Sequence, residues 1–302
     1  MSCRARSTDD LERAAWPGST VTPIRLAEPV LRWFEERDFE RLQTPDVTVG
    51  HGVLAPDVFF SLLAGSSRSS VHLQPARRPL DARPRLHPHR LAVHHQVYAL
   101  TCRGDLAPLE LVVGALTVLG FDASEHDLRL RGRDAGLPFA GIDASGWSLA
   151  IDGVEVGRAS WLVSVGGLPL ATPALELVFG LERLAVVLPE EARTVAGDSV
   201  FRRMRAWEEE ELASHGLETA DLDRLATRLD LLLGESEASL EAGLPLMAFR
   251  SLLEAVQVAE TLEQRDPAAR RSEVERRIAR GIARCATVGA ARQSSEPTGD
   301  EI

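Results

Sequence analysis

The sequence predicts an α+β fold in which an antiparallel sheet flanked by helices is followed by a C-terminal helical bundle. Between about residues 46 and 188, short β-like runs such as "HQVYALTC" and "SWLVSVGG" alternate with Gly/Pro turns. Helical patterns are few there, and such spacing favours an antiparallel sheet over repeated βαβ units. After about residue 200 the apolar residues recur at helical intervals, which is the pattern of a bundle.

Four segments are expected along the chain. Residues 1–24 are polar and predict a loose tail, 25–200 a sheet domain, 201–290 a helical bundle and 291–302 a disordered tail. These boundaries follow the change from β-like runs to helical spacing of apolar residues. No internal repeat is apparent.

Individual elements follow from local patterns. Residues 28–42 and 107–120 have apolar side chains at helical spacing. The pair Asp152-Gly153 in "IDGVEVG" is the strongest hairpin signal in the chain. Three apolar stripes predict the bundle helices, the first of them ending at Gly234; they run through Leu222–Leu232, Leu246–Leu262 and Val274–Cys285.

Charged residues surround an apolar corner in "ALELVFGLERLAVVL". The first half alternates like a strand and the second has helical spacing, with Gly180 between them. Arg183, at the start of the helix, could point into a cleft, and Glu176 on the strand could hold a metal or an amino group. The alternative is a local ion pair between Arg183 and a glutamate.

Composition excludes several classes of protein. The chain has 302 residues, 44% of them hydrophobic, and a net charge of −11, which disfavours general nucleic-acid binding. Neither a membrane span nor a secretory signal is apparent, and three cysteines share no spacing motif, so we expect a cytoplasmic location. All 34 basic residues are arginine, which excludes a catalytic or P-loop lysine.

One locally basic stretch is "QPARRPLDARPRLHPHR", residues 74–90, which we expect to be an extended loop because it is rich in proline and charge. Arg77, Arg78, Arg83 and Arg90 could converge on a polyphosphate, since a guanidinium binds phosphate in a bidentate manner. A solvated loop is the alternative.

The histidines carry weaker signals. His87, His89, His94 and His95 cluster as metal ligands do, but His94 and His95 are adjacent and would face opposite sides of a strand. The pair in "SEHDLRL" lacks a serine nucleophile in a sharp turn, so neither a metal site nor a catalytic triad is favoured.

Taken together, the motifs resemble the α subunit of bacterial heterotetrameric glycyl-tRNA synthetase. They occur in the family's order: "VTVGHG", "LQPARRPLDAR", "HPHRL", "LGFDASEHDLR", "GWSLAIDGVEV", "SVGG" and "FGLERLAVVL". The resemblance implies a class II synthetase catalytic domain, with ATP and Mg²⁺ as cofactors.

The resemblance also implies roles for individual residues. Arg78, in the second class II motif, and Arg183, in the third, would be the catalytic pair that contacts the ATP phosphates. The implied ATP-binding set is Arg77, Arg78, Asp81, Arg83, Arg90, Gln96, Glu176, Gly180 and Arg183, with Glu176 also the candidate ligand of Mg²⁺. The implied amino-acid pocket is Gln74, Trp147, Ser148, Arg158, Ser160 and Ser164.

The sequence departs from the family mainly in that pocket. Ser148 replaces a glutamate, and a polar and aromatic run has become "GRASWLVS", residues 157–164. Three hypotheses remain open: a divergent enzyme that forms an aminoacyl adenylate for tRNA or another acceptor, a degenerate paralogue that binds a nucleotide or a partner, and an ordinary α subunit. The resemblance implies a homodimer, a β-type partner subunit and tRNA binding only through such a partner.

Overall fold

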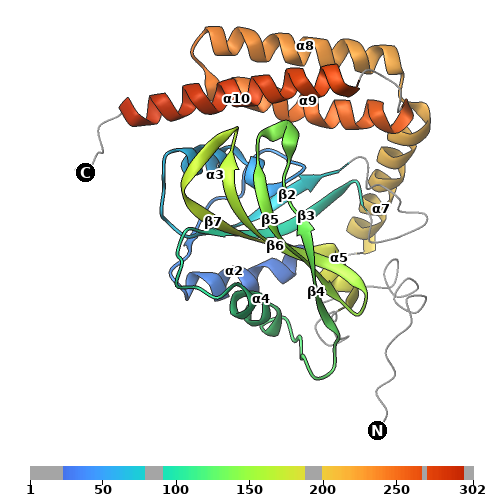
Figure 1. The fold of residues 1–302 in the computed structure, drawn as a ribbon. Helices are drawn as coiled ribbons and strands as arrows, with labels where there is room; N and C mark the ends of the chain where they lie inside the picture. The colour runs from blue at the N-terminus through green and yellow to red at the C-terminus, as the bar shows by residue number, and fades with distance from the viewer. Residues whose placement is uncertain (1–22, 79–90, 188–198, 267–270, 296–302) are drawn as a thin grey trace.

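The computed structural model describes residues 23–78, 91–187, 199–266 and 271–295. Its centre is a seven-stranded sheet in the order β1-β2-β3-β7-β6-β5-β4 (Figure 1). The strands are β1 Glu40–Arg41, β2 Ser70–Arg77, β3 Val93–Thr101, β4 Leu128–Asp134, β5 Asp143–Ile151, β6 Val154–Val165 and β7 Leu168–Gly180. β1 and β2 are parallel, and the other neighbouring pairs are antiparallel. The predicted α+β class is therefore confirmed.

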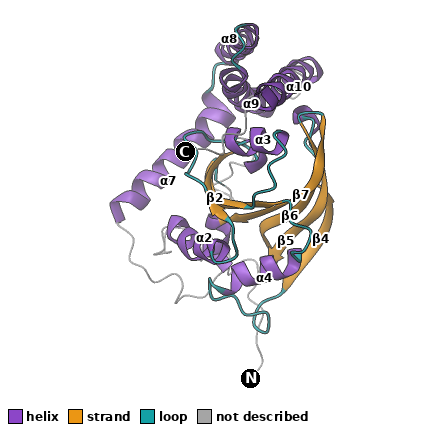
Figure 2. Ribbon diagram, turned by 90° about the vertical axis from the view of Figure 1, so that its left-hand side faces the viewer, coloured by secondary structure: helices purple, strands orange, loops and turns teal. Residues whose placement is uncertain are grey.

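Helices cover both faces of the curved sheet (Figure 2). One face packs on α2 Ala27–Glu35, α4 Pro108–Thr117 and α5 Leu181–Val187. The opposite face packs on α3 Pro56–Leu63 and on the C-terminal helices. Short turns of 3₁₀ helix lie at Pro23–Leu26, Gly52–Leu54 and Pro138–Ala140.

The C-terminal region contains α7 Ser199–Ser214, a π turn at His215–Thr219, α8 Leu222–Glu241, α9 Pro245–Arg265 and α10 Arg271–Ser295. Phe249 on α9 stacks on Phe59 of α3 with 4.3 Å between ring centroids. Apolar side chains of α8, α9 and α10 therefore belong to the same core as one face of the sheet.

The predicted hairpin is present between β5 and β6. Asp152 and Gly153 both have positive φ, 51° and 87°, which is the backbone geometry of a type I′ turn. The helix expected at 107–120 is α4, and the three stripes lie on α8, α9 and α10.

Four expectations about element limits were wrong. The helix expected at 28–42 ends at Glu35, because Asp38 adopts φ 64° and returns Phe39 to a contact 4.9 Å from the Phe34 ring. Gly234 does not end α8, since an interior glycine costs only about 1 kcal/mol and the buried Leu240 extends the packed stripe.

The other two concern the basic stretch and the tails. Residues 74–77 are part of β2 rather than a loop, because they pair with β3. α10 continues to Ser295, past the predicted boundary at 290, and α7 begins before 201. Residues 79–90, 1–22 and 296–302 lie outside the described residues.

In the part of the chain described here, no helix combines the length and apolarity needed to cross a membrane.

Candidate active site

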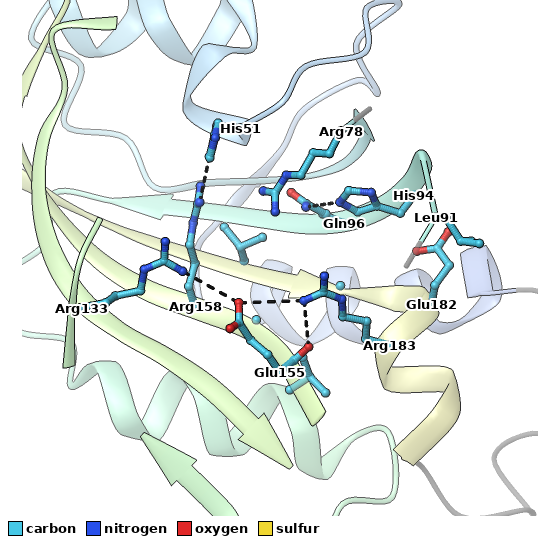
Figure 3. A pocket seen from close by; sticks show the side chains of 14 residues that line it. His51, Arg78, Leu91, His94, Gln96, Arg133, Glu155, Arg158, Glu182 and Arg183 are labelled. Atoms are coloured by element: carbon cyan, nitrogen blue, oxygen red, sulfur yellow. Dashed lines mark hydrogen bonds and ion pairs between the residues drawn. The ribbon is translucent and has the colours of Figure 1, made fainter. Parts of the chain in front are cut away.

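A cleft lined largely by charged side chains lies where β3, β6 and β7 meet the loop that precedes α3 (Figure 3). Four arginines, two glutamates and two histidines dominate its lining, which comprises His51, Arg78, Leu91, His94, Gln96, Arg133, Glu155, Val156, Gly157, Arg158, Val178, Gly180, Glu182 and Arg183. The cleft is therefore predominantly cationic and suits an anionic ligand.

Arg78 and Arg183 line this cleft together, although they are far apart in the sequence. The Nε of Arg78 donates to the carbonyl of Gly50 at 2.8 Å. The Nη1 of Arg183 donates to the carbonyl of Glu155 at 3.2 Å. Each guanidinium is thus oriented by a backbone acceptor.

Glu182 fixes the start of α5 against β3. The backbone N–H of His95 donates to both carboxylate oxygens of Glu182, at 3.0 and 2.9 Å, and the ring Nδ1 of His95 lies 3.0 Å from Oε1. Because Glu182 is buried, these bonds hold the neighbouring Arg183 at the edge of the cleft.

The beginning of β3 is held from a second direction. Glu209 on α7 is buried, and its carboxylate accepts from the backbone N–H groups of Ala92 at 2.6 Å and Val93 at 3.1 Å. The backbone N–H of Arg78 donates to the carbonyl of Ala92 at 2.8 Å. A helix of the C-terminal region therefore helps to position the strand that carries His94 and Gln96.

Arg158 is the most buried arginine of the cleft. Its Nε donates to Oε1 of Glu176 at 2.8 Å, and its Nη1 lies 3.0 Å from Nδ1 of His51. Burial and the nearby Arg158, Arg78 and Arg133 hold the pKa of His51 well below its usual value. His51 is consequently neutral and accepts a hydrogen bond from Arg158.

Glu155 lies at the open side of the cleft, between two arginines. Its Oε1 is 3.9 Å from Nη1 of Arg133 and 3.9 Å from Nη1 of Arg183. About half of the Glu155 side chain is exposed, so this group remains accessible to a ligand.

The structure brings together part of the predicted ATP-binding set. Gln96 and Gly180 line the cleft beside Arg78 and Arg183. Arg77 is half-buried on β2 outside the lining, and Glu176 is buried behind Arg158. Asp81, Arg83 and Arg90 lie outside the described residues.

Of the six residues predicted for the amino-acid pocket, Arg158 is in the lining of the described cleft. Gln74 is buried and donates to the carbonyls of Val47 and Pro75. Ser164 bonds Asp143 and Gly141, away from the cleft. Ser160 is fully buried opposite Glu176, Ser148 is half-buried opposite Arg158, and Trp147 is partly exposed on β5.

Sequence reasoning did not select His51, Arg133, Glu155 or Glu182 as site residues. His51 had a signal, since it stands between two glycines in a turn. Among the described residues, no group of three His, Cys, Asp or Glu side chains could hold a metal ion. His126, from the His-Asp pair considered for a catalytic triad, instead bonds Asp152, with 2.8 Å between its Nδ1 and Oδ2. His87 and His89 lie outside the described residues.

Comparison with known proteins identifies the family of this chain. The family model described as glycyl-tRNA synthetase alpha subunit matches residues 28–293. The glycine–tRNA ligase alpha subunit of Coprothermobacter proteolyticus is 30% identical over 227 residues, which cover 74% of this chain and 78% of that protein.

Longer relatives match as well. The chloroplastic/mitochondrial glycine–tRNA ligase 2 of Arabidopsis thaliana is 28% identical over 74% of this chain, and the glycine–tRNA ligase of Chlamydia muridarum is 27% identical over 78% of it. The match covers 21% and 24% of those two proteins. With a family model matched over most of its length, the chain belongs to the glycyl-tRNA synthetase alpha subunit family.

Proposed function

We propose that the protein uses ATP to activate a carboxylic acid, forming an acyl adenylate and releasing pyrophosphate, as a ligase of the glycine–tRNA ligase type. The observation that carries this proposal is the placement of Arg78 and Arg183 in one open cleft. The two guanidinium groups come from separate segments and offer several N–H donors to one triphosphate.

In the proposed reaction, a carboxylate oxygen of the acid attacks the α-phosphorus of ATP, and the bond to the pyrophosphate breaks. Negative charge increases on the phosphoryl oxygens during this displacement. Donors that are already oriented stabilise this charge without reorganising, and no covalent enzyme nucleophile is required. Arg78 and Arg183 are anchored by Gly50 and Glu155 in this manner.

Magnesium would accompany the nucleotide. Mg²⁺ in such sites is bound by one or two carboxylates together with substrate phosphates, where it neutralises phosphate charge. Glu155 fits this role better than Glu176, because Glu155 is half-exposed in the cleft whereas Glu176 is buried against Arg158. The role predicted for Glu176 as a ligand remains a prediction.

For the acceptor, we propose that tRNA is bound through a β-type partner. The net charge of −11 does not favour binding of a polyanion by this chain alone. The chain also matches only 21% and 24% of the two longer glycine–tRNA ligases. The homodimer expected from the resemblance is part of the same proposal.

The test is amino-acid-dependent exchange of labelled pyrophosphate into ATP, with a panel of carboxylic acids. Exchange that depends on one acid, and that falls by about 100-fold or more in Arg183→Ala, supports the proposal. Arg129→Ala is the matched control, because Arg129 lies on β4 outside the cleft lining and pairs with Asp127. ATP binding without exchange for any acid would favour a nucleotide-binding regulator instead.

A further inference from the structure

Arg158 presents a guanidinium to the cleft in a fixed orientation. Its side chain is only 9% exposed, with Glu176 held at 2.8 Å from Nε and His51 at 3.0 Å from Nη1. Glu176 is buried outside the lining, whereas His51 and Arg158 both line the cleft. In Figure 3, Arg158 and His51 lie at one side of the cleft, and Arg183 and His94 at the other.

The surroundings of Arg158 favour an anion over a cation. Neutral His51 accepts from Arg158 through Nδ1, which leaves the proton of the ring on Nε2. Arg133 also lines this part of the cleft. A ligand group placed beside Arg158 therefore meets mainly N–H donors.

The carboxylates described around the cleft already have arginine or histidine neighbours. Glu155 lies between Arg133 and Arg183 and is half-exposed, Glu182 accepts from His95, and Oε1 of Glu176 accepts from Arg158, while its buried Oε2 has no hydrogen-bond partner among the described residues. An ammonium group next to Arg158 would be repelled by the guanidinium. The buried Oε1 of Gln96 is a neutral acceptor elsewhere in the lining, and it would serve the ammonium of any amino acid equally.

We propose that Arg158 determines substrate specificity by binding a second carboxylate, so that the acid activated is a dicarboxylic acid or an acidic amino acid rather than glycine. This inference rests on the proposed function, in which the reacting carboxylate lies between Arg78 and Arg183 at the α-phosphate. The far end of the acid then reaches Arg158. The Nε of Arg158 is held by Glu176 and its Nη1 by His51, so Nη2 and the second hydrogen of Nη1 are the donors offered to that second carboxylate.

The test is calorimetric titration of the full-length protein, saturated with a non-hydrolysable ATP analogue, with succinate, L-aspartate and glycine. We expect succinate or aspartate to bind at least ten times more tightly than glycine. Arg158→Gln should lower affinity for the diacid by about 10- to 100-fold, which is the value of one or two hydrogen bonds to a charged group. Binding of the ATP analogue, measured in parallel, should fall by less than the affinity for the diacid.

Two further variants separate recognition from stability. Arg158→Gln leaves Glu176 buried without its cationic partner, so the double variant Arg158→Gln/Glu176→Gln removes both charges and should show the same loss of diacid binding. Arg129→Gln, on the exposed edge strand, should bind like the wild type.

The inference is overturned if glycine binds as tightly as the diacids, if no diacid binds, or if the double variant retains diacid affinity. Its failure is distinct from failure of the proposed function. Diacid binding that depends on Arg158, in a protein without pyrophosphate exchange, would refute acid activation and leave the specificity site intact. Exchange with glycine that is unaffected by Arg158→Gln would support acid activation and refute the role of Arg158 in specificity.

Discussion

Substitution of Gly52 by alanine tests whether the loop before α3 is packed as tightly as the structure indicates. An added Cβ would lie 2.1 Å from Cδ2 and 2.5 Å from Cε2 of Tyr98, both far inside van der Waals contact. Tyr98 is fully buried, so its ring cannot move into solvent. Such overpacking costs about 1–3 kcal/mol, and the depth of this overlap places Gly52→Ala at about 3 kcal/mol.

The matched control lies in the same loop. A Cβ on Gly50 would approach no atom closer than the carbonyl oxygen of Arg77 at 3.9 Å, so Gly50→Ala should change the free energy of unfolding by less than about 0.5 kcal/mol. Because the carbonyl of Gly50 orients Arg78, Gly52→Ala should also weaken ATP binding while the protein remains folded.

Urea unfolding followed by circular dichroism measures both variants, and a double-mutant cycle locates the strain. Tyr98→Ala removes the ring, so the combined variant Gly52→Ala/Tyr98→Ala should be less destabilised than the sum of the single changes by about 2 kcal/mol. Equal stability of Gly52→Ala and Gly50→Ala, or additivity in the cycle, would refute the packing of this loop on Tyr98.

Two further predictions concern Glu182 and His72. Glu182→Ala removes an acceptor buried against His95, so it should lower the free energy of unfolding in urea by about 2–3 kcal/mol and weaken ATP binding. Glu125→Ala, at an exposed turn, is the control. Equal stability of the two variants would contradict the role of Glu182. Burial lowers the pKa of His72 from 6.5 to about 4, so below pH 6.5 the unfolded chain takes up a proton that the folded protein does not. This group should therefore lower the free energy of unfolding by about 3 kcal/mol as the pH falls from 6.5 to 4. His72→Leu should make the free energy of unfolding depend less on pH over that range. An unchanged slope would argue against a neutral, buried His72.

Local sequence patterns predicted the parts of the fold that depend on local interactions. The turn at Asp152-Gly153 needs positive φ at two adjacent residues, and that pair supplies it. The limit of α2 was not predictable in this way, because it depends on Phe39 returning to the Phe34 ring across a left-handed Asp38. Gly234 was misread because the buried stripe beyond it outweighs one unfavourable helix residue.

The candidate site shows the same division. Arg78 and Arg183 were identified because their motifs resemble those of a known family, and the structure places both in the cleft. In the sequence Glu182 is only a charged residue at the start of a predicted helix. Its role was not predictable, because its partner His95 lies on another element, β3. Arg158 was expected in the amino-acid pocket, but its pairing with Glu176 depends on the register of β6 and β7, which the sequence does not reveal.

The absence of lysine from this chain is consistent with how the cleft is built. Arg78, Arg158 and Arg183 each bond a protein acceptor: Arg78 the carbonyl of Gly50, Arg158 the carboxylate of Glu176 and the ring of His51, and Arg183 the carbonyl of Glu155. A planar guanidinium anchored at one nitrogen is fixed in orientation and still has other N–H donors in the same plane. A lysine ammonium anchored in this way would remain a single point charge on a flexible stem. Preorganisation of the cleft therefore depends on the shape of arginine as much as on its charge, and lysine at these three positions would preserve the charge and lose the orientation.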